Sequence, residues 1–200
     1  MPGFWDERFA GEDYRYGTEP NDFLRAQAGA IPAGGRVLSL GEGEGRNAVH
    51  LAGLGLAVTA LDASPVGLDK ARRLAARRGV AVETLLADLD DYRFAPGHWD
   101  GIVNIYCHLP PALRRRVHAR IVAALRPGGV LILEGFTPDQ LRFHSGGPRD
   151  PAMLWRAEAL RAELAGLDFP ILREVEREIS EGSGHGGRAA VVQMLACKPQ

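Results

Sequence analysis

Short apolar runs alternate along this chain with longer stretches in which apolar residues recur every three or four positions. The runs are typical of buried strands, and the longer stretches are typical of helices with one apolar face. Regular alternation of the two predicts parallel strands joined by right-handed crossovers. The predicted strands are 37–40, 58–61, 82–87, 99–105 and 130–134, and the predicted helices are 21–30, 48–54, 65–79, 110–126 and 151–166.

Two further apolar runs near the C-terminus predict a strand pair. One run extends through Val175 and Ile179, the other covers 189–195, and the glycine-rich segment 182–187 separates them, as in antiparallel hairpins. The expected fold class is therefore α/β, a Rossmann-like doubly wound sheet of seven strands, mostly parallel with an antiparallel last strand. In such a sheet the 182–187 turn lies on the ligand-binding edge, and its glycines leave it free to close.

The length of the chain suits a single domain over 1–200. Its Rossmann-like core covers 34–200, and an N-terminal arm and helix cover 1–33. The arm mixes aromatic and charged residues without a regular pattern. It either packs against the core or forms a lid over a ligand pocket, with Tyr14 or Tyr16 facing that pocket.

Three glycines follow the first predicted strand and precede its helix. Gly41, Gly43 and Gly45 permit positive φ and a close approach of a ligand to the backbone. The helix that follows points its free N–H groups toward this loop. The dinucleotide fingerprint G-x-G-x-x-G requires a glycine where this chain has Arg46, which makes a nicotinamide oxidoreductase the least favoured reading.

Carboxylates end the next two predicted strands. Asp62 follows the second strand and suits the two hydroxyls of a ribose. Asp88 follows the third strand and suits the exocyclic amine of adenine. A glycine loop, a ribose acid and an adenine acid in this order indicate an adenosine ligand without a pyrophosphate.

These features resemble the class I S-adenosylmethionine-dependent methyltransferases. The Leu-Arg-Pro-Gly-Gly segment at 125–129 is similar to that family's turn before its fifth strand. The family usually has an acid where this chain has Ser39, and the nearest acids here are Glu42 and Glu44. The short length and aromatic N-terminal segment most resemble the tellurite-resistance (TehB-like) methyltransferases. The resemblance implies S-adenosylmethionine as cofactor and S-adenosylhomocysteine as product, bound by Gly41, Glu42, Gly43, Gly45, Asn47, Asp62, Ala63, Asp88, Leu89, Asn104 and Tyr106.

Methyl transfer requires an aligned acceptor, exclusion of water and removal of any proton that the acceptor carries. His185 is expected to act as base and Arg188 as a bidentate clamp for an anionic acceptor, although His185 also fits an exposed turn. His108 is a third catalytic candidate, which also fits a helix cap or a core position. The expected substrate-pocket residues are Tyr14, Tyr16 and Arg149, and no metal site is predicted.

Composition narrows the class of partner. The net charge of −1 provides no general field for nucleic acid or an anionic membrane. No apolar run reaches the roughly 18 residues that a transmembrane helix needs. The two cysteines do not form a disulfide framework, so a cytoplasmic location is expected. The protein is expected to be a monomer or a homodimer.

Missing motifs restrict the acceptor. The residues at 104–107 lack the paired prolines that amino-directed nucleic-acid methyltransferases carry after the fourth strand, and two cysteines are too few for arsenic methylation. The remaining acceptors are small: a thiol, a chalcogen oxyanion such as tellurite or selenite, or a small organic molecule. Two alternatives stay open, a protein lysine methyltransferase and a non-catalytic module that binds an adenosyl ligand.

Overall fold

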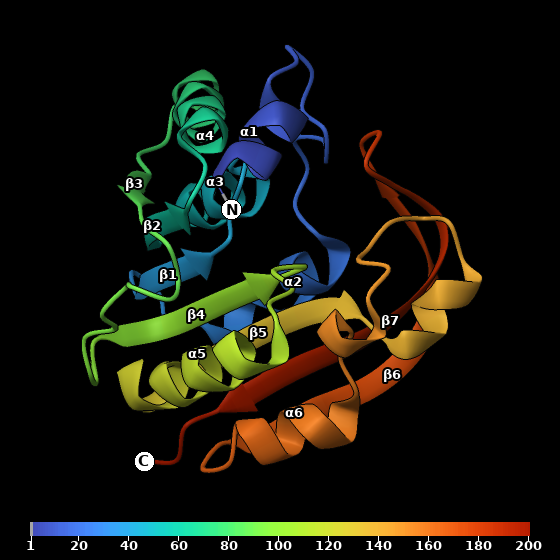
Figure 1. The fold of residues 1–200 in the computed structure, drawn as a ribbon. Helices are drawn as coiled ribbons and strands as arrows, with labels where there is room; N and C mark the ends of the chain where they lie inside the picture. Colours follow the sequence, from blue (N-terminus) through green and yellow to red (C-terminus); the bar gives the residue numbers. More distant parts are fainter. Residues whose placement is uncertain (1) are drawn as a thin grey trace.

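The computed structural model describes residues 2–200 and contains a seven-stranded sheet with helices on both faces (Figure 1). The strand order is β3-β2-β1-β4-β5-β7-β6. β1 pairs in parallel with β2 and β4, whereas β7 runs antiparallel to β5 and β6. The predicted Rossmann-like sheet is therefore confirmed. The strands are β1 (Arg36–Leu40), β2 (Ala57–Asp62), β3 (Glu83–Leu86), β4 (Trp99–Ile105), β5 (Leu125–Phe136), β6 (Asp168–Glu181) and β7 (His185–Cys197).

Helices cover both faces of the sheet, so its central strands are buried on both sides. Leu38 and Leu131 pack with α5 and α6 on one face, while Val37 and Val130 pack with α2, α3 and α4 on the other. Adjacent residues of one strand thus enter different cores, as the alternation of side chains requires. Within the described residues, no helix is both long and apolar enough to span a bilayer. The helices are α1 (Pro2–Phe9), α2 (Asp22–Gln27), α3 (Arg46–Gly53), α4 (Pro65–Arg78), α5 (Pro111–Ala124) and α6 (Ala157–Glu163), with 3-10 turns η1 (Ala28–Ala30), η2 (Pro138–Arg142) and η3 (Pro151–Met153).

The strand order determines where a ligand can bind. The direction of strand addition reverses at β1, so the crevice at the carboxyl ends of β1 and β4 is the switch point. Because β7 is antiparallel to both of its neighbours, β6 runs parallel to β5 and ends at the same edge. The turn between β6 and β7 therefore lies on the edge that carries the glycine loop, as the sequence predicted.

The N-terminal arm begins with a helix where the sequence predicted no regular structure. Trp5 and Phe9, four residues apart in α1, stack with 5.5 Å between their ring centroids, and the Arg8 guanidinium lies over the ring of Phe4. Pairs at this spacing stabilise a short helix. α1 packs beside α4 (Figure 1), which supplies the surface that an isolated segment of this length lacks.

The last strands are longer than predicted. β5 already begins at Leu125, because this residue pairs with Trp99 of β4. Pairing of β6 with β7 continues up to the contact between Glu181 and His185, so the turn shrinks to residues 182–184.

The predicted helix over 151–166 is interrupted. Leu154 and Trp155 separate η3 from α6 and are 5% and 1% exposed. The N–H of Trp155 donates to the carbonyl of Phe136 at 2.9 Å. A backbone hydrogen bond to the end of β5 replaces the bond that a continuous helix would make at this position.

Gly45 permits close packing of α3 against α4. It has φ +93°, and a Cβ added there would lie 2.6 Å from Cα of Ala71. We expect Gly45→Ala to lower the free energy of unfolding by roughly 2–5 kcal/mol, because left-handed strain and overpacking add. Urea unfolding followed by circular dichroism measures the loss. Gly34→Ala is the matched control: Gly34 has φ +69° but open space around it, so only about 1–2 kcal/mol should be lost. Equal losses would show that packing at Gly45 contributes nothing.

Candidate active site

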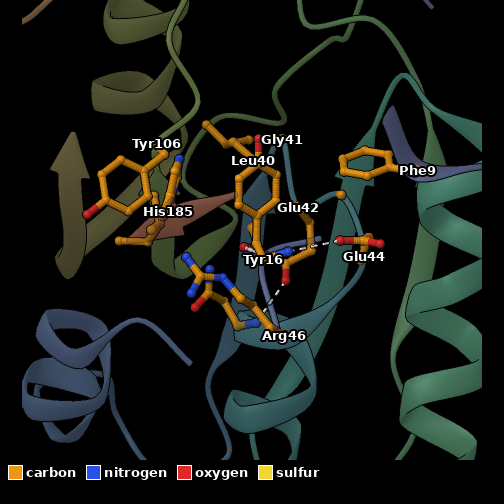
Figure 2. Close-up of a pocket in the computed structure, with 13 residues that line it drawn as sticks. Phe9, Tyr16, Leu40, Gly41, Glu42, Glu44, Arg46, Tyr106 and His185 are labelled. Carbon is orange, nitrogen blue, oxygen red and sulfur yellow. Dashed lines mark hydrogen bonds between the residues drawn. The ribbon is translucent and has the colours of Figure 1, made fainter. Parts of the chain in front are cut away.

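A pocket lies at the carboxyl edge of β1 and β4, between the glycine loop and the N-terminal arm (Figure 2). Phe9 and Tyr16 line it from the arm, Tyr106 from the end of β4, and His185 from the first residue of β7. The glycine loop and the start of α3 complete the wall. The pocket thus joins segments from both ends of the chain.

The expected positive φ of the loop glycines is confirmed, with 56°, 60° and 93° at Gly41, Gly43 and Gly45. A Cβ added to Gly41 would lie 2.5 Å from Sγ of Cys107, and one added to Gly43 would lie 3.0 Å from the ring of Phe9. Side chains at these positions would fill the space above the loop. Glycine is therefore required there by space as well as by backbone conformation.

The carboxylate of Glu42 closes the amino end of α3. Its Oε1 accepts the N–H groups of Asn47 at 3.0 Å and Ala48 at 2.9 Å, and its Oε2 accepts the hydroxyl of Ser39. Burial raises the pKa of Glu42 above its ordinary value, although these hydrogen bonds oppose the rise. Glu42 thus places a carboxylate beside Ser39, where the related family usually has an acid. A helix end that already holds a carboxylate is unsuited to a pyrophosphate.

Asp62, at the end of β2, contacts the glycine loop. Its carboxylate accepts the N–H group of Gly43 in the loop at 2.7 Å. It also accepts the N–H group of Ser64, two residues further along the chain, at 2.8 Å. Burial raises the pKa of Asp62, and these backbone donors partly offset that effect. Each carboxylate oxygen keeps a second lone pair, so Asp62 can still accept ribose hydroxyls. Asp88 is exposed, and its Oδ1 accepts a backbone N–H at 2.9 Å.

Five of the eleven residues predicted to bind the cofactor line the pocket, and six do not: Gly45, Asp62, Ala63, Asp88, Leu89 and Asn104. Leu89 is 7% exposed and packs into the largest core cluster. Asn104 is 1% exposed, and the next residue, Ile105, lines the pocket. Adjacent strand residues point to opposite faces, which directs the Asn104 side chain away. Cofactor binding by Leu89 and Asn104 therefore stays a prediction, which the pocket lining does not support.

Lys70 of α4 holds the arm against the glycine loop. Its buried Nζ donates to the carbonyls of Gly11 at 2.8 Å and Asp13 at 2.6 Å, and it lies 2.6 Å from the carboxylate of Glu44. The N–H of Tyr16 also donates to Glu44, at 3.4 Å. One buried cation therefore links the arm to the loop, an arrangement that suits the lid hypothesis.

His185 is buried rather than exposed in a turn. It is 6% exposed, and the ring centroids of Tyr16 and Tyr106 lie 4.5 and 4.7 Å from its own. Its Nδ1 lies 3.0 Å from Oε2 of Glu181, which also pairs with Arg46 at 3.0 Å. Burial lowers the pKa of His185, and Glu181 opposes this. Burial raises the pKa of Glu181, but His185 and Arg46 together hold it at about 2. The pair is therefore a neutral imidazole oriented by a carboxylate.

The glycines of the β6–β7 turn serve close packing. A Cβ at Gly182 would collide with the backbone of Arg15 and Gly17, and one at Gly184 would collide with the ring of Tyr16. The N–H of Gly184 donates to the carbonyl of Arg15 at 2.8 Å. The arm thus occupies the space beside the turn, and the expectation that the turn is free to close is wrong.

Tyr106 carries backbone strain at the end of β4. Its φ of +55° is the sole positive value at a non-glycine residue in the described part of the chain. A bulky residue keeps this conformation only where its surroundings enforce it. Its hydroxyl donates to Oε1 of Glu134 at 2.7 Å, and its ring stacks on Phe136 at 4.6 Å. Burial and the charge of Glu134 raise the pKa of Tyr106 well above its ordinary value, so a protonated tyrosine is fixed in the pocket wall.

Two further carboxylates, those of Glu134 and Glu181, lie at this edge and were not predicted as site residues. Glu134 and Glu181 are 0% and 7% exposed. Each lies near the carboxyl end of a strand that runs toward the ligand-binding edge. A charged residue at that position in β5, after an apolar run, is the signal that identifies such a group.

Arg188 does not reach the pocket, in contrast to the prediction. It is exposed, and its guanidinium pairs with Glu176 at 3.1 Å. Three residues along an extended strand reverse the direction of a side chain, so Arg188 and His185 point to opposite faces of the hairpin.

His108 is held by two backbone groups. Its Nδ1 lies 2.8 Å from the carbonyl oxygen of Met153, and its Nε2 accepts the N–H of Phe136 at 3.0 Å. Burial lowers the pKa of His108 to about 4. Because the lone pair of the neutral ring is already used, this geometry favours a structural role for His108 over the predicted catalytic one.

Of the three predicted substrate-pocket residues, only Tyr16 lines the pocket. The hydroxyl of Tyr14 donates to the carbonyl of Lys70 at 2.9 Å, which directs the ring toward α4. Arg149 is exposed in the segment after β5, 3.2 Å from Nδ1 of His144. Tyr14 and Arg149 therefore do not line this pocket.

The sheet order, with the glycine loop at the switch point and an acid at the end of β2, is that of the class I S-adenosylmethionine-dependent methyltransferases. Residues 37–129 match the family model described as a methyltransferase domain. This match lies within the predicted core, and the resemblance to methyltransferases inferred from the sequence is confirmed.

Two curated relatives match part of the chain. Ribosomal protein L11 methyltransferase of Symbiobacterium thermophilum is 38% identical over 107 residues, which cover 52% of this chain and 33% of that protein. 2-Heptyl-1-hydroxyquinolin-4(1H)-one methyltransferase of Mycobacteroides abscessus is 33% identical over 113 residues, which cover 52% of this chain and 50% of that protein. The matches thus span half or less of the length of these relatives.

Solved structures share the fold over nearly the whole chain. A structure described as "Conversion of a Disulfide Bond into a Thioacetal Group during Echinomycin Biosynthesis" has a TM-score of 0.80 at 23% identity, covering 100% of this chain and 92% of that chain. TehB from Haemophilus influenzae has a TM-score of 0.71 at 17% identity, covering 98% and 66%. The N-methyltransferase NodS from Bradyrhizobium japonicum WM9, in complex with S-adenosylhomocysteine, has a TM-score of 0.72 at 17% identity, covering 100% and 98%. These similarities establish a common fold.

Proposed function

We propose that this protein transfers the methyl group of S-adenosylmethionine to a small acceptor that carries a removable proton. The observation that carries this proposal is the buried His185–Glu181 pair in the same pocket as the glycine loop. The two curated relatives are both named as methyltransferases, which agrees with this activity.

The donor set of the pocket suits an adenosyl amino acid. Asp62 does not line the pocket itself but contacts its wall at Gly43, where it offers lone pairs to ribose hydroxyls, and Glu42 already occupies the helix end that a phosphate would need. Nη1 of Arg46 is buried and has no hydrogen-bond partner within the described residues. A carboxylate such as that of the cofactor's amino-acid part would satisfy this nitrogen. The pocket thus offers partners for the ribose and for the amino acid and disfavours a pyrophosphate.

The residues of the pocket have separate roles in the methyl transfer. When bound, the cofactor supplies a methyl group that is already activated. His185, neutral because burial lowers its pKa, accepts the proton of the acceptor at Nε2, while Glu181 holds Nδ1–H and stabilises the resulting imidazolium. The ring of Tyr16 and the arm above it exclude water from this step.

The pocket favours a thiol or a small organic molecule as acceptor over a chalcogen oxyanion. Its walls include the rings of Tyr16 and Tyr106, and Arg188, the expected anion clamp, points elsewhere. The arm that Lys70 holds over the loop also disfavours a protein lysine, which needs an open cleft. Tellurite and selenite remain alternatives through the shared fold with TehB.

Cofactor choice gives a direct test. Titration calorimetry should detect binding of S-adenosylmethionine and S-adenosylhomocysteine and none of NAD at the same concentration, because the Glu42 carboxylate opposes a pyrophosphate. Adenosine serves as the control for the half of the ligand that NAD also contains. Binding of NAD without a response to the adenosyl ligands would refute the proposed function.

The methyl acceptor can be identified by testing a panel of candidate molecules. Labelled methyl donor is incubated with thiols, phenols, amines, selenite, tellurite and a lysine peptide, and the methylated product is separated. Transfer to a thiol or small organic molecule is the expected result. Cofactor binding without transfer to any acceptor would favour the non-catalytic module.

A further inference from the structure

Asn21, at the start of α2, is completely buried within the polar groups behind the pocket. Its Nδ2 donates to Oε1 of Glu134 at 2.7 Å and to Oε1 of Glu181 at 2.9 Å. Its Oδ1 accepts the N–H of Leu24 at 3.0 Å, and its own N–H donates to Oδ1 of Asn47 at 3.0 Å. The side-chain amide therefore gives one hydrogen to each of two carboxylates.

The two carboxylates come from neighbouring parts of the ligand-binding edge. Glu134 of β5 also accepts the hydroxyl of Tyr106 at 2.7 Å and the amide of Gln193 at 2.6 Å. Glu181 of β6 also pairs with Arg46 at 3.0 Å. Buried like charges that share one nitrogen repel each other. A neutral donor between them stabilises both as anions and fixes their positions.

We infer that Asn21 is a positioning residue: by bridging Glu134 and Glu181, its amide holds the Glu181 carboxylate against Nδ1–H of His185. The inference rests on the proposed function, in which His185 is the base. Capping of α2 alone does not require asparagine, because serine and aspartate cap helices equally well. Only an amide both accepts from Leu24 and donates to two carboxylates.

Loss of this bridge should change the pKa of His185 in a definite direction. Without the amide donor, Glu181 is a less stabilised anion, and an added carboxylate increases the negative charge beside His185. Both changes favour the imidazolium and raise the pKa of His185. Because a protonated His185 accepts no proton, the acidic limb of the turnover profile moves to higher pH. The titratable and charged groups facing His185 are Glu181, Arg46, Arg15, Tyr16, Tyr106 and His108.

Two variants separate positioning from capping. Asn21→Asp and Asn21→Ser both keep an oxygen for Leu24, but an ionised aspartate donates nothing and the serine is too short to bridge two carboxylates. NMR of the full-length protein with isotope-labelled histidine gives the titration midpoint and tautomer of His185. We expect the midpoint to rise by about one pH unit or more in Asn21→Asp and by less in Asn21→Ser. The acidic limb of kcat should move by the same amount, with little change in KM.

Controls make each outcome decisive. Asp150→Ala removes a cap from η3, where Oδ1 accepts the N–H of Ala152 at 2.9 Å, and should leave the His185 titration unchanged. Combining Asn21→Asp with Glu134→Gln exchanges amide and carboxylate across one contact and should move the midpoint back toward the wild-type value. Melting temperatures identify any variant that does not fold. If Asn21→Asp does not fold, the His185 titration in Asn21→Ser tests the inference.

The inference and the proposed function fail in different ways. An unchanged midpoint and tautomer of His185 in a folded Asn21 variant would overturn the inference, whatever the activity. A shifted midpoint in a protein whose wild type transfers no methyl group would support the inference about Asn21 and Glu181 while overturning the proposed function.

Discussion

Replacing His185 with alanine is expected to lower kcat by roughly 100- to 10,000-fold, the usual contribution of a positioned base. The imidazole is neutral because burial lowers its pKa, and Glu181 fixes which nitrogen carries the proton. Affinity for S-adenosylhomocysteine should be nearly unchanged, because the proposed cofactor contacts lie on Asp62, Arg46 and the glycine loop rather than on His185. Steady-state kinetics with an acceptor from the panel, together with calorimetry, measure both quantities.

Two further variants keep this prediction independent of folding. Alanine at His185 removes a ring that packs against Tyr16, so His185→Asn is included, whose amide can still donate to Glu181 but cannot act as a base. Arg188→Ala is the control, since its guanidinium is exposed on the opposite face and should leave turnover intact. Wild-type turnover in both histidine variants would exclude His185 as the base.

In the wild type, turnover should fall only when the pH drops below the ordinary pKa of histidine, because protonation of His185 then removes the base.

Asp62→Ala is expected to weaken binding of S-adenosylhomocysteine by roughly 10- to 100-fold, which corresponds to about 1.5–3 kcal/mol for hydrogen bonds to a charged group. The buried carboxylate is the proposed acceptor for the ribose hydroxyls. It also accepts the N–H of Gly43 at 2.7 Å, so its removal loosens the loop at the same time. Calorimetry gives the dissociation constant, and thermal unfolding without ligand gives the accompanying loss of stability.

Asp100→Ala is the matched control for Asp62. Asp100 also accepts a backbone N–H next to a strand, that of Arg36 at 2.8 Å, but it lies near the amino end of β4, away from the pocket. This variant should lower the melting temperature without changing ligand affinity. An unchanged dissociation constant in Asp62→Ala, combined with a lowered melting temperature, would make Asp62 a structural acid like Asp100.

The amino-acid sequence by itself determined the parts of this protein that depend on neighbouring residues. The alternation of apolar runs and helical spacing specified the strands and helices, and with the rules of chain connection it specified the sheet. Gly41, Gly43 and Gly45 have the positive φ that their spacing indicated, and Asp62 ends a strand at the same edge as the glycine loop. These features follow from local backbone preferences and from the common edge at which parallel strands end.

Only the tertiary structure decided which polar side chains meet. Asn21 and Glu181 are 160 positions apart in the sequence, and Arg46 and Glu181 are 135 apart, yet both pairs are in hydrogen-bond contact. The direction of a side chain depends on strand register, which brings His185 into the pocket and turns Arg188 to the opposite face. The surroundings of each histidine then determine its chemistry. At His108 both ring nitrogens contact the backbone, so the residue is a structural group. At His185 a carboxylate orients one ring nitrogen and leaves the other for the acceptor, so this residue is the candidate base.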